Sequence, residues 1–186
     1  MKRLLAGIAC LALSVGAFAQ GTVVFNNSPG AVGGTGAPVF DVDGTTRLEG
    51  TGFAAILYAG PDAGSLTAWG DPLNFRTGAG AGFFNTTGVN INRTIDSVAG
   101  GGTAFIQVRA WETAGGTITT YDAAVAGGYK VGSSEIFSLA TGGGGQPAAP
   151  PVNLVGLTSF SLVPEPTTYA LLALGAAALF LRRRNK

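Results

Sequence analysis

The stretch Thr103-Ala-Phe-Ile-Gln-Val-Arg-Ala-Trp111 decides the fold of this chain. Its even positions are all apolar and hold Ala104, Ile106, Val108 and Ala110. Successive side chains of a β-strand point to opposite faces of a sheet, so this alternation predicts a strand with one buried face. The segment 53–58, Phe-Ala-Ala-Ile-Leu-Tyr, is apolar on both alternating sets, which predicts a strand buried on both faces.

Glycine separates short β-prone runs along the rest of the chain and makes up 31 of its 186 residues, far above ordinary usage. We predict strands at residues 22–26, 38–42, 51–59, 73–76, 82–87, 89–98, 103–112, 117–121, 135–140 and 158–162, and one short helix at 122–126. Short strands at intervals of about ten residues, with turn residues between them, are typical of sandwiches and barrels. The sequence therefore predicts an all-β fold, a single Gly-rich antiparallel β-sandwich of jelly-roll-like form.

The charges of the chain are unevenly distributed. The body, residues 20–163, holds five basic and nine acidic residues, whereas the other basic residues lie near the two ends. A mildly acidic body without a basic patch excludes a nucleic-acid partner. The chain has no His, and its single Cys, Cys10, precedes the body. These absences remove Ser-His-Asp catalysis, thiolate metal sites and disulfides from the body. We expect a protein without enzymatic activity and without a cofactor.

The N-terminus has the pattern of a secretory signal peptide, residues 1–19. Lys2 and Arg3 precede an uncharged apolar run, and Ala17 and Ala19 supply the small residues that signal peptidase requires. We expect cleavage between Ala19 and Gln20. Lipidation at Cys10 is an alternative, although Gly7 stands where a lipobox has Leu.

Three segments follow one another at the C-terminus: Pro164-Glu165-Pro166, an uncharged apolar run at 167–181, and the basic tail 182–186. An apolar helix that ends in positive charge is typical of a membrane stop, and Arg182, Arg183 and Arg184 would remain on the cytoplasmic side. Fifteen residues span about 22 Å as a helix, less than a hydrocarbon core of about 30 Å. We therefore predict a transmembrane helix at 167–181 that holds the chain only transiently.

This order of segments resembles the PEP-CTERM sorting signal of bacterial surface proteins, a tail also known as the ice-binding protein C-terminal motif. The resemblance covers residues 164–186 and implies that a membrane-embedded, exosortase-like protease recognises and cuts near Pro164, Glu165 and Pro166. It implies export, transient residence in the inner membrane, and then a place at the cell surface or in the extracellular matrix. It also implies a link to exopolysaccharide, because exosortases occur in bacteria that make it.

Asp41-Val-Asp43-Gly44 is similar to the start of a calcium-binding loop. A full EF-hand loop needs a third ligand two residues later and a Glu at its twelfth position, where this chain has Thr45 and Gly52. A β-turn supplied by Asp-Gly is the favoured interpretation. Asp41 and Asp43 remain weak calcium candidates, with Glu49 as a further ligand of an irregular site.

Three classes of function stay open at this point. The first is a structural or adhesive envelope protein. The second is a carbohydrate- or ice-binding module, in which aromatic residues form a sugar-stacking platform; the candidates are Tyr58, Trp69, Trp111, Tyr121 and Tyr129. Ice binding is disfavoured because the threonines have no regular spacing. The third is a hydrolase without His, which would need the acidic pairs Asp62/Asp71 or Glu112/Asp122 to converge.

Overall fold

The computed structural model describes residues 19–164, and strands predominate in them. The strands are β1 (Gln20–Val24), β2 (Val39–Phe40), β3 (Phe53–Gly60), β4 (Thr67–Asn74), β5 (Asn92–Ala99), β6 (Thr103–Glu112), β7 (Val131–Ser133), β8 (Phe137–Ala140), β9 (Val152–Asn153) and β10 (Phe160–Ser161). The two α-helices are α2 (Pro29–Val32) and α3 (Tyr121–Gly127), and three short 3₁₀ turns cover Gly50–Gly52, Gly78–Gly80 and Ala114–Gly116. The all-β prediction is confirmed.

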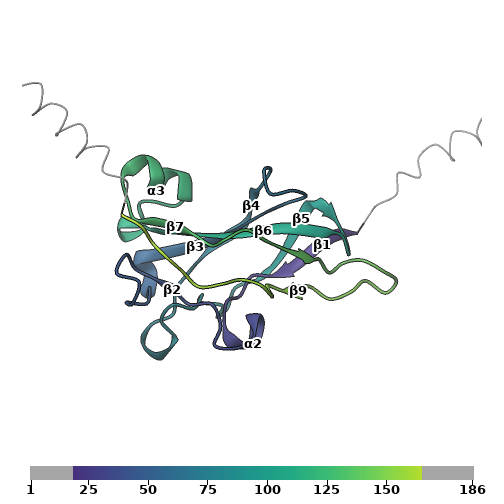
Figure 1. Cartoon of the computed structure of the whole chain (residues 1–186), viewed down its shortest axis with the longest axis horizontal. Helices are drawn as coiled ribbons and strands as arrows, with labels where there is room; N and C mark the ends of the chain where they lie inside the picture. The colour runs from purple at the N-terminus through teal and green to yellow at the C-terminus, as the bar shows by residue number, and fades with distance from the viewer. Residues whose placement is uncertain (1–18, 165–186) are drawn as a thin grey trace, which may run out of the picture.

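The largest sheet has five strands and is organised around β6 (Figure 1). On one side β6 pairs antiparallel with β3, from Phe53–Glu112 to Gly60–Phe105. On its other side β6 pairs with β7 near one end and with β8 near the other. The four even-numbered apolar residues of β6 have no exposed surface, as their alternation predicts.

Two smaller sheets complete the strand pairing, one in the order β5-β1-β9 and one formed by β10 and β2. In both, a late strand pairs parallel with an early one: β9 with β1, and β10 with β2. The prediction of a purely antiparallel arrangement is therefore wrong at these two pairs. Parallel neighbours need a long connection, which most of the chain provides here. Sequence patterns of two-residue strands do not reveal such distant pairing.

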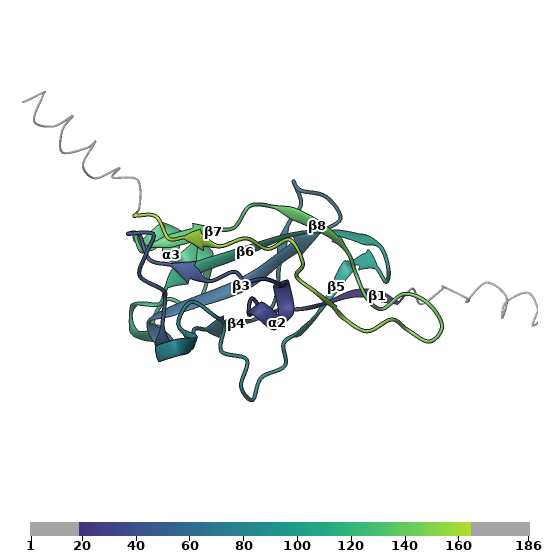
Figure 2. The ribbon, with the colours of Figure 1, turned by 60° about the horizontal axis from the view of Figure 1, so that its bottom comes forward.

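The main hydrophobic core joins residues of all three sheets, including Val23 of β1, Leu57 of β3, Ile106 of β6 and Leu162 beside β10. A second, smaller cluster lies on the other face of the five-stranded sheet, where Trp111 and Ala54 pack under Ala124 of α3. Figure 2 shows α3 beside β6 and β7, with α2 at a distance from it. The prediction that the segment 53–58 is buried on both faces is confirmed, whereas the sandwich itself stays a prediction.

Two predicted strands, 82–87 and 117–121, are not strands. Phe84 is fully buried in a loop, where it forms only an isolated antiparallel bridge with Phe75, and the side chain of Asn27 satisfies backbone groups beside it. Asn27 Oδ1 accepts from the Phe84 N–H at 2.8 Å, and its Nδ2 donates to the carbonyl of Gly82 at 2.9 Å. A buried amide that satisfies backbone groups leaves no pattern in the loop itself.

The segment 117–121 is instead the approach to α3. The indole Nε1 of Trp111 donates to the Ile118 carbonyl at 3.1 Å, and Thr120 Oγ1 accepts from the Ala123 N–H as the N-cap of the helix. The predicted helix at 122–126 is confirmed as α3, which is capped at its C-terminus by Gly128 with φ of 76°. The short strands β7 and β9, the first residues of β4, and helix α2 were not predicted.

The two ends of the described chain lie at opposite ends of the molecule (Figure 1). β1 begins at Gln20, the residue expected to follow signal cleavage, and Pro164 lies three residues after Ser161, the end of the last strand. Ala17, the helix predicted at 167–181 and the basic tail 182–186 lie outside the described residues. Within residues 19–164, no helix is long and apolar enough to cross a membrane.

Replacing Ile106 with Ala should destabilise the protein by about 2–5 kcal/mol, because the change leaves a cavity at a fully buried position of the central strand. Urea unfolding followed by tryptophan fluorescence measures the effect. Ile136→Ala is the matched control, since that side chain is 42% exposed. The assignment of β6 as the central buried strand would be wrong if both variants unfolded at the same urea concentration.

Candidate functional site

The last described residues, 160–164, form a junction between the body and the sequence that follows; we call it the C-terminal junction. Phe160 and Ser161 pair with Val39 and Phe40 as β10 and β2. The Leu162 N–H donates to the Phe40 carbonyl at 2.9 Å, and the Val163 N–H donates to the Val131 carbonyl at 2.8 Å. Backbone hydrogen bonds therefore hold the chain as far as Val163.

Burial changes abruptly along this junction. Leu162 is 1% exposed and belongs to the main core, whereas Val163 is 53% exposed and Pro164 is exposed. Proline has no N–H to donate and a fixed φ, so it does not continue a β-ladder. The body consequently ends within one residue, and Pro164 is presented to solvent without an intervening linker.

Gly132 of β7 makes this close approach possible. A Cβ atom at this position would lie 2.6 Å from the Ser161 carbonyl oxygen and 3.0 Å from Leu162 Cα. Both are backbone atoms, which cannot swing aside as a long side chain does. The sequence gives no sign of this contact, because Gly132 is one glycine among many and β10 lies far along the chain.

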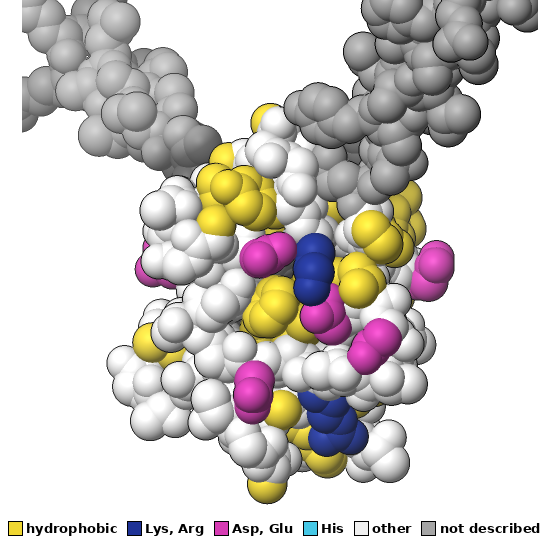
Figure 3. Space-filling view, turned by 90° about the vertical axis from the view of Figure 1, so that its left-hand side faces the viewer, with side chains coloured by type: hydrophobic (Ala, Val, Ile, Leu, Met, Phe, Trp, Pro, Cys, Tyr) yellow, Lys and Arg dark blue, Asp and Glu magenta, His cyan; other side chains and the backbone are white. Residues whose placement is uncertain are grey.

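An ion pair supports the same end of the molecule. Lys130 Nζ donates to both carboxylate oxygens of Asp41, at 3.0 and 2.9 Å, and the two residues lie 89 positions apart. Lys130 directly precedes β7, and Asp41 directly follows β2. The pair is partly exposed, so it contributes at most about 1 kcal/mol to stability. Figure 3 views this end and shows acidic and basic side chains beside one another, with hydrophobic patches between them.

The calcium candidates Asp41 and Asp43 are engaged within the protein. Asp41 pairs with Lys130, and Asp43 accepts from the N–H groups of Thr45 and Thr46 at 2.9 and 2.8 Å. Hydrogen bonds from the Thr46 hydroxyl and these N–H groups hold the pKa of Asp43 well below its usual range. Gly44 has φ of 69°, as a turn requires. This geometry supports the turn interpretation, and the described residues include no group of three possible ligands that could hold a metal.

The five aromatic candidates do not form one platform. Trp111 is 1% exposed and packs under α3, with Tyr129 beside it. Trp69 packs against the main core, and its Nε1 donates to the Ala59 carbonyl at 3.0 Å. Among these five side chains, only Tyr58 and Tyr121 form a ring-to-ring contact, with centroids 6.4 Å apart in an edge-to-face arrangement. The sugar-stacking hypothesis is therefore reduced to these two rings.

Of the four acidic residues considered for hydrolysis, Asp62 has local hydrogen-bond partners. Asp62 lies in the turn between β3 and β4, where it accepts from the Gly64 N–H at 2.9 Å and the Ser65 hydroxyl at 2.7 Å. These hydrogen bonds lower the pKa of Asp62, the Ser65 hydroxyl having the larger effect. Asp122 lies in the first turn of α3, a favourable place for an acidic side chain.

Arg93 is a buried cation that was not singled out from the sequence, and it shares the buried face of β5 with Ile95. It is 6% exposed and lines a hollow of about 420 Å³ between β4 and β5. Its guanidinium donates to the carbonyls of Asn90 and Asp71 at 2.5 and 2.8 Å, and it lies 5.5 Å from the Phe25 ring centroid. Burial lowers the pKa of Arg93, and Asp71 opposes this effect. These contacts assign Arg93 to tying the loop before β5 to β4.

Replacing Gly132 with Ala should push β10 away from β7, destabilise the protein by about 1–3 kcal/mol, and make the C-terminal junction sensitive to proteases. Limited proteolysis with mass spectrometry measures where the chain is cut. Gly30→Ala is the control, because a Cβ there meets nothing within 4 Å. Equal resistance of the two variants at residues 160–164 would contradict the close packing of the junction.

Comparisons with known proteins give one match. The family model described as the PEP-CTERM protein-sorting motif matches residues 162–184, so it begins at the buried Leu162 and includes the whole exit from the body. No curated protein and no solved structure matches the chain. The match confirms the resemblance drawn from the sequence. The chain therefore carries a PEP-CTERM protein-sorting motif, which implies export, passage through the membrane and sorting through an exosortase to the cell surface.

Proposed function

We propose that this chain is a structural or adhesive protein of the bacterial cell envelope or extracellular matrix, sorted and processed through its C-terminal tail. The observation that carries the proposal is the position of the sorting motif, which joins the folded body without a linker. Pro164 is exposed directly after Val163, where an enzyme embedded in the membrane can reach it.

The proposed division of labour within the tail follows from its chemistry. Pro164, Glu165 and Pro166 are the recognition and processing site, since prolines keep a segment extended and free of backbone pairing. The apolar run 167–181 holds that segment at a fixed depth, and Arg182, Arg183 and Arg184 stop translocation. Glu165 and the residues after it lie outside the described residues, so these roles rest on the sequence and the family match.

A role without catalysis is supported by the structural contacts that several carboxylates of the body already make. The chain has no His, and Asp41, Asp43 and Asp62 serve an ion pair or turns of the body. We propose a link to exopolysaccharide, which the sorting pathway implies. A carbohydrate-binding module is the second candidate, and the proximity of Tyr58 and Tyr121 on one sheet face favours it.

Replacing Pro164, Glu165 and Pro166 together with Ala should leave the protein exported but uncleaved in the inner membrane of a host that has an exosortase. The reason is that the change removes the extended segment that the protease recognises and retains the apolar run. Cell fractionation and mass spectrometry of the C-terminal peptide measure the outcome.

Deletion of residues 182–186 is the complementary variant, and it should let the chain pass through the membrane unprocessed. Each basic residue near an anionic membrane surface contributes about 1 kcal/mol to retention. Release of the triple-Ala variant with the same C-terminus as the unaltered protein would show that the tail is only an anchor.

A further inference from the structure

The basic side chains of the body differ in how many of their nitrogens form hydrogen bonds or ion pairs. Lys130 is paired with Asp41, and the guanidinium of Arg93 donates to backbone carbonyls. Arg76 donates to the Phe84 carbonyl at 3.0 Å and to the Thr86 hydroxyl at 2.8 Å. Arg47 is exposed and forms no hydrogen bond within residues 19–164. Arg109 is fixed at one nitrogen and unpartnered at the other two: it donates from Nε to Gln107 Oε1 at 2.8 Å, and its terminal nitrogens have no partner within the same residues.

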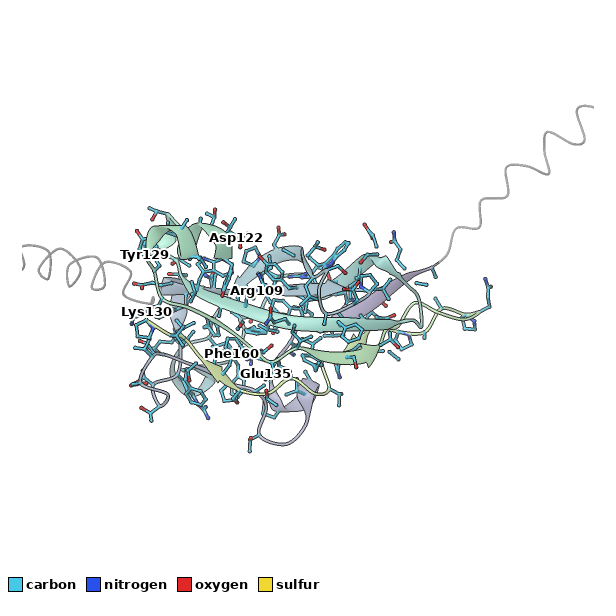
Figure 4. All side chains as sticks on the ribbon, turned by 45° about the horizontal axis from the view of Figure 1, so that its top comes forward. Arg109, Asp122, Tyr129, Lys130, Glu135 and Phe160 are labelled. Carbon is cyan, nitrogen blue, oxygen red and sulfur yellow. The ribbon has the colours of Figure 1, made fainter. Side chains whose placement is uncertain are left out.

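The surrounding side chains hold the Arg109 guanidinium in place. Its central carbon lies 3.9 Å from the centroid of the Tyr58 ring and 5.2 Å from that of Tyr121. Gln107, which accepts from its Nε, donates in turn to the Ser134 carbonyl at 3.1 Å. Figure 4 places Arg109 on the sheet and Asp122 on the neighbouring helix α3. A guanidinium stacked on one ring and fixed at Nε is already ordered before any ligand arrives.

Two hydroxyl groups belong to the same cluster. Within the described part of the chain, neither the Tyr58 nor the Tyr121 hydroxyl has a hydrogen-bond partner, and neither is a buried, unsatisfied group. Burial raises the pKa of Tyr121, Arg109 opposes this effect, and Tyr58 and Asp122 add to it, so the hydroxyl stays protonated at neutral pH. Tyr121 is half-buried and so remains partly open to solvent, whereas Tyr58 is buried.

Asp122 is the acidic residue next to Tyr121 in the cluster of Arg109, Tyr58 and Tyr121. It is exposed in the first turn of α3 and forms no ion pair with Arg109, although it influences the titration of Tyr121. Among residues 19–164, Lys130–Asp41 is the only ion pair. Arg109 is thus a rigid cation beside two aromatic rings, and its forked end is not neutralised by a carboxylate.

We propose that Arg109, Tyr58 and Tyr121 form a binding site for a carboxylate-bearing saccharide, such as a uronic acid residue of an acidic polysaccharide. The terminal nitrogens of Arg109 match the two oxygens of a planar carboxylate, and the open part of Tyr121 packs against a sugar ring. This inference rests on the exopolysaccharide link in the proposed function. It names the charge of the saccharide and the residues that recognise it.

Isothermal titration of the full-length chain in detergent with a galacturonic acid trimer tests the site, with a glucose trimer and inorganic phosphate as comparison ligands. The uronic acid trimer should bind in preference to both. Arg109→Gln should weaken that binding by about tenfold or more, the loss expected when one partner of a charge-assisted pair is removed. Arg47→Gln is the matched control: Arg47 is an exposed arginine 5.6 Å from the Phe83 ring, outside the cluster, and its loss should leave binding unchanged.

Asp122→Asn is a second variant that keeps Arg109 in place, so its result does not depend on whether Arg109→Gln folds. It should strengthen binding of the uronic acid trimer, because it removes a negative charge near the site. Equal binding of the glucose trimer, equal binding of phosphate, no binding of the uronic acid trimer, or equal loss in the Arg47 and Arg109 variants would each overturn the proposal. The assay does not involve sorting, so its failure leaves the result of the triple-Ala experiment intact. Failure of that experiment likewise leaves this one interpretable.

Discussion

The pairing of β6 with β3 is the interaction on which the rest of the structure depends. One face of β6 supplies Ile106 and Val108 to the main core, which the smaller sheets close from the other side. Its opposite face carries Arg109 and Trp111, over which α3 packs. Because successive side chains of a strand alternate between faces, a single regular strand both builds the core and displays the arginine cluster. A shift of register by one residue would exchange the two faces and abolish both features.

At both ends of the body, backbone pairing between strands reaches almost to the first and last residues of the body. β1 begins at Gln20, and backbone pairing at the other end continues through Val163. The sorting motif begins at Leu162, within the core, so the body and its tail share residues. A protease that acts near Pro164 therefore meets an exposed proline directly after residues that are held by backbone hydrogen bonds. This arrangement confines cutting to residues after Val163 unless β10 first separates from β2.

The sequence predicted those parts of the fold that local patterns encode. Alternation in β6, two-sided burial in β3 and the helix at α3 all follow from the identities of neighbouring residues. The parallel pairing of β9 and β10, the role of Asn27 beneath the loop at Phe84, and the contact of Gly132 with β10 were beyond prediction, because each joins residues far apart in the chain. The candidate sites likewise include one part that the sequence predicted and one that it did not. The tail motif was readable as a contiguous pattern, whereas the cluster around Arg109 forms only when β3, β6 and α3 come together.

Hydrogen–deuterium exchange at the C-terminal junction of the full-length chain tests the central claim most directly, namely that the body is ordered up to Val163 and presents Pro164 without a linker. Backbone hydrogen bonds in a core ladder exchange only when the structure opens. The account predicts that the amides of Leu162 and Val163 exchange nearly as slowly as those of β6. Exchange of these two amides at the rate of an unstructured peptide would contradict it, because the sorting motif would then hang from a flexible linker.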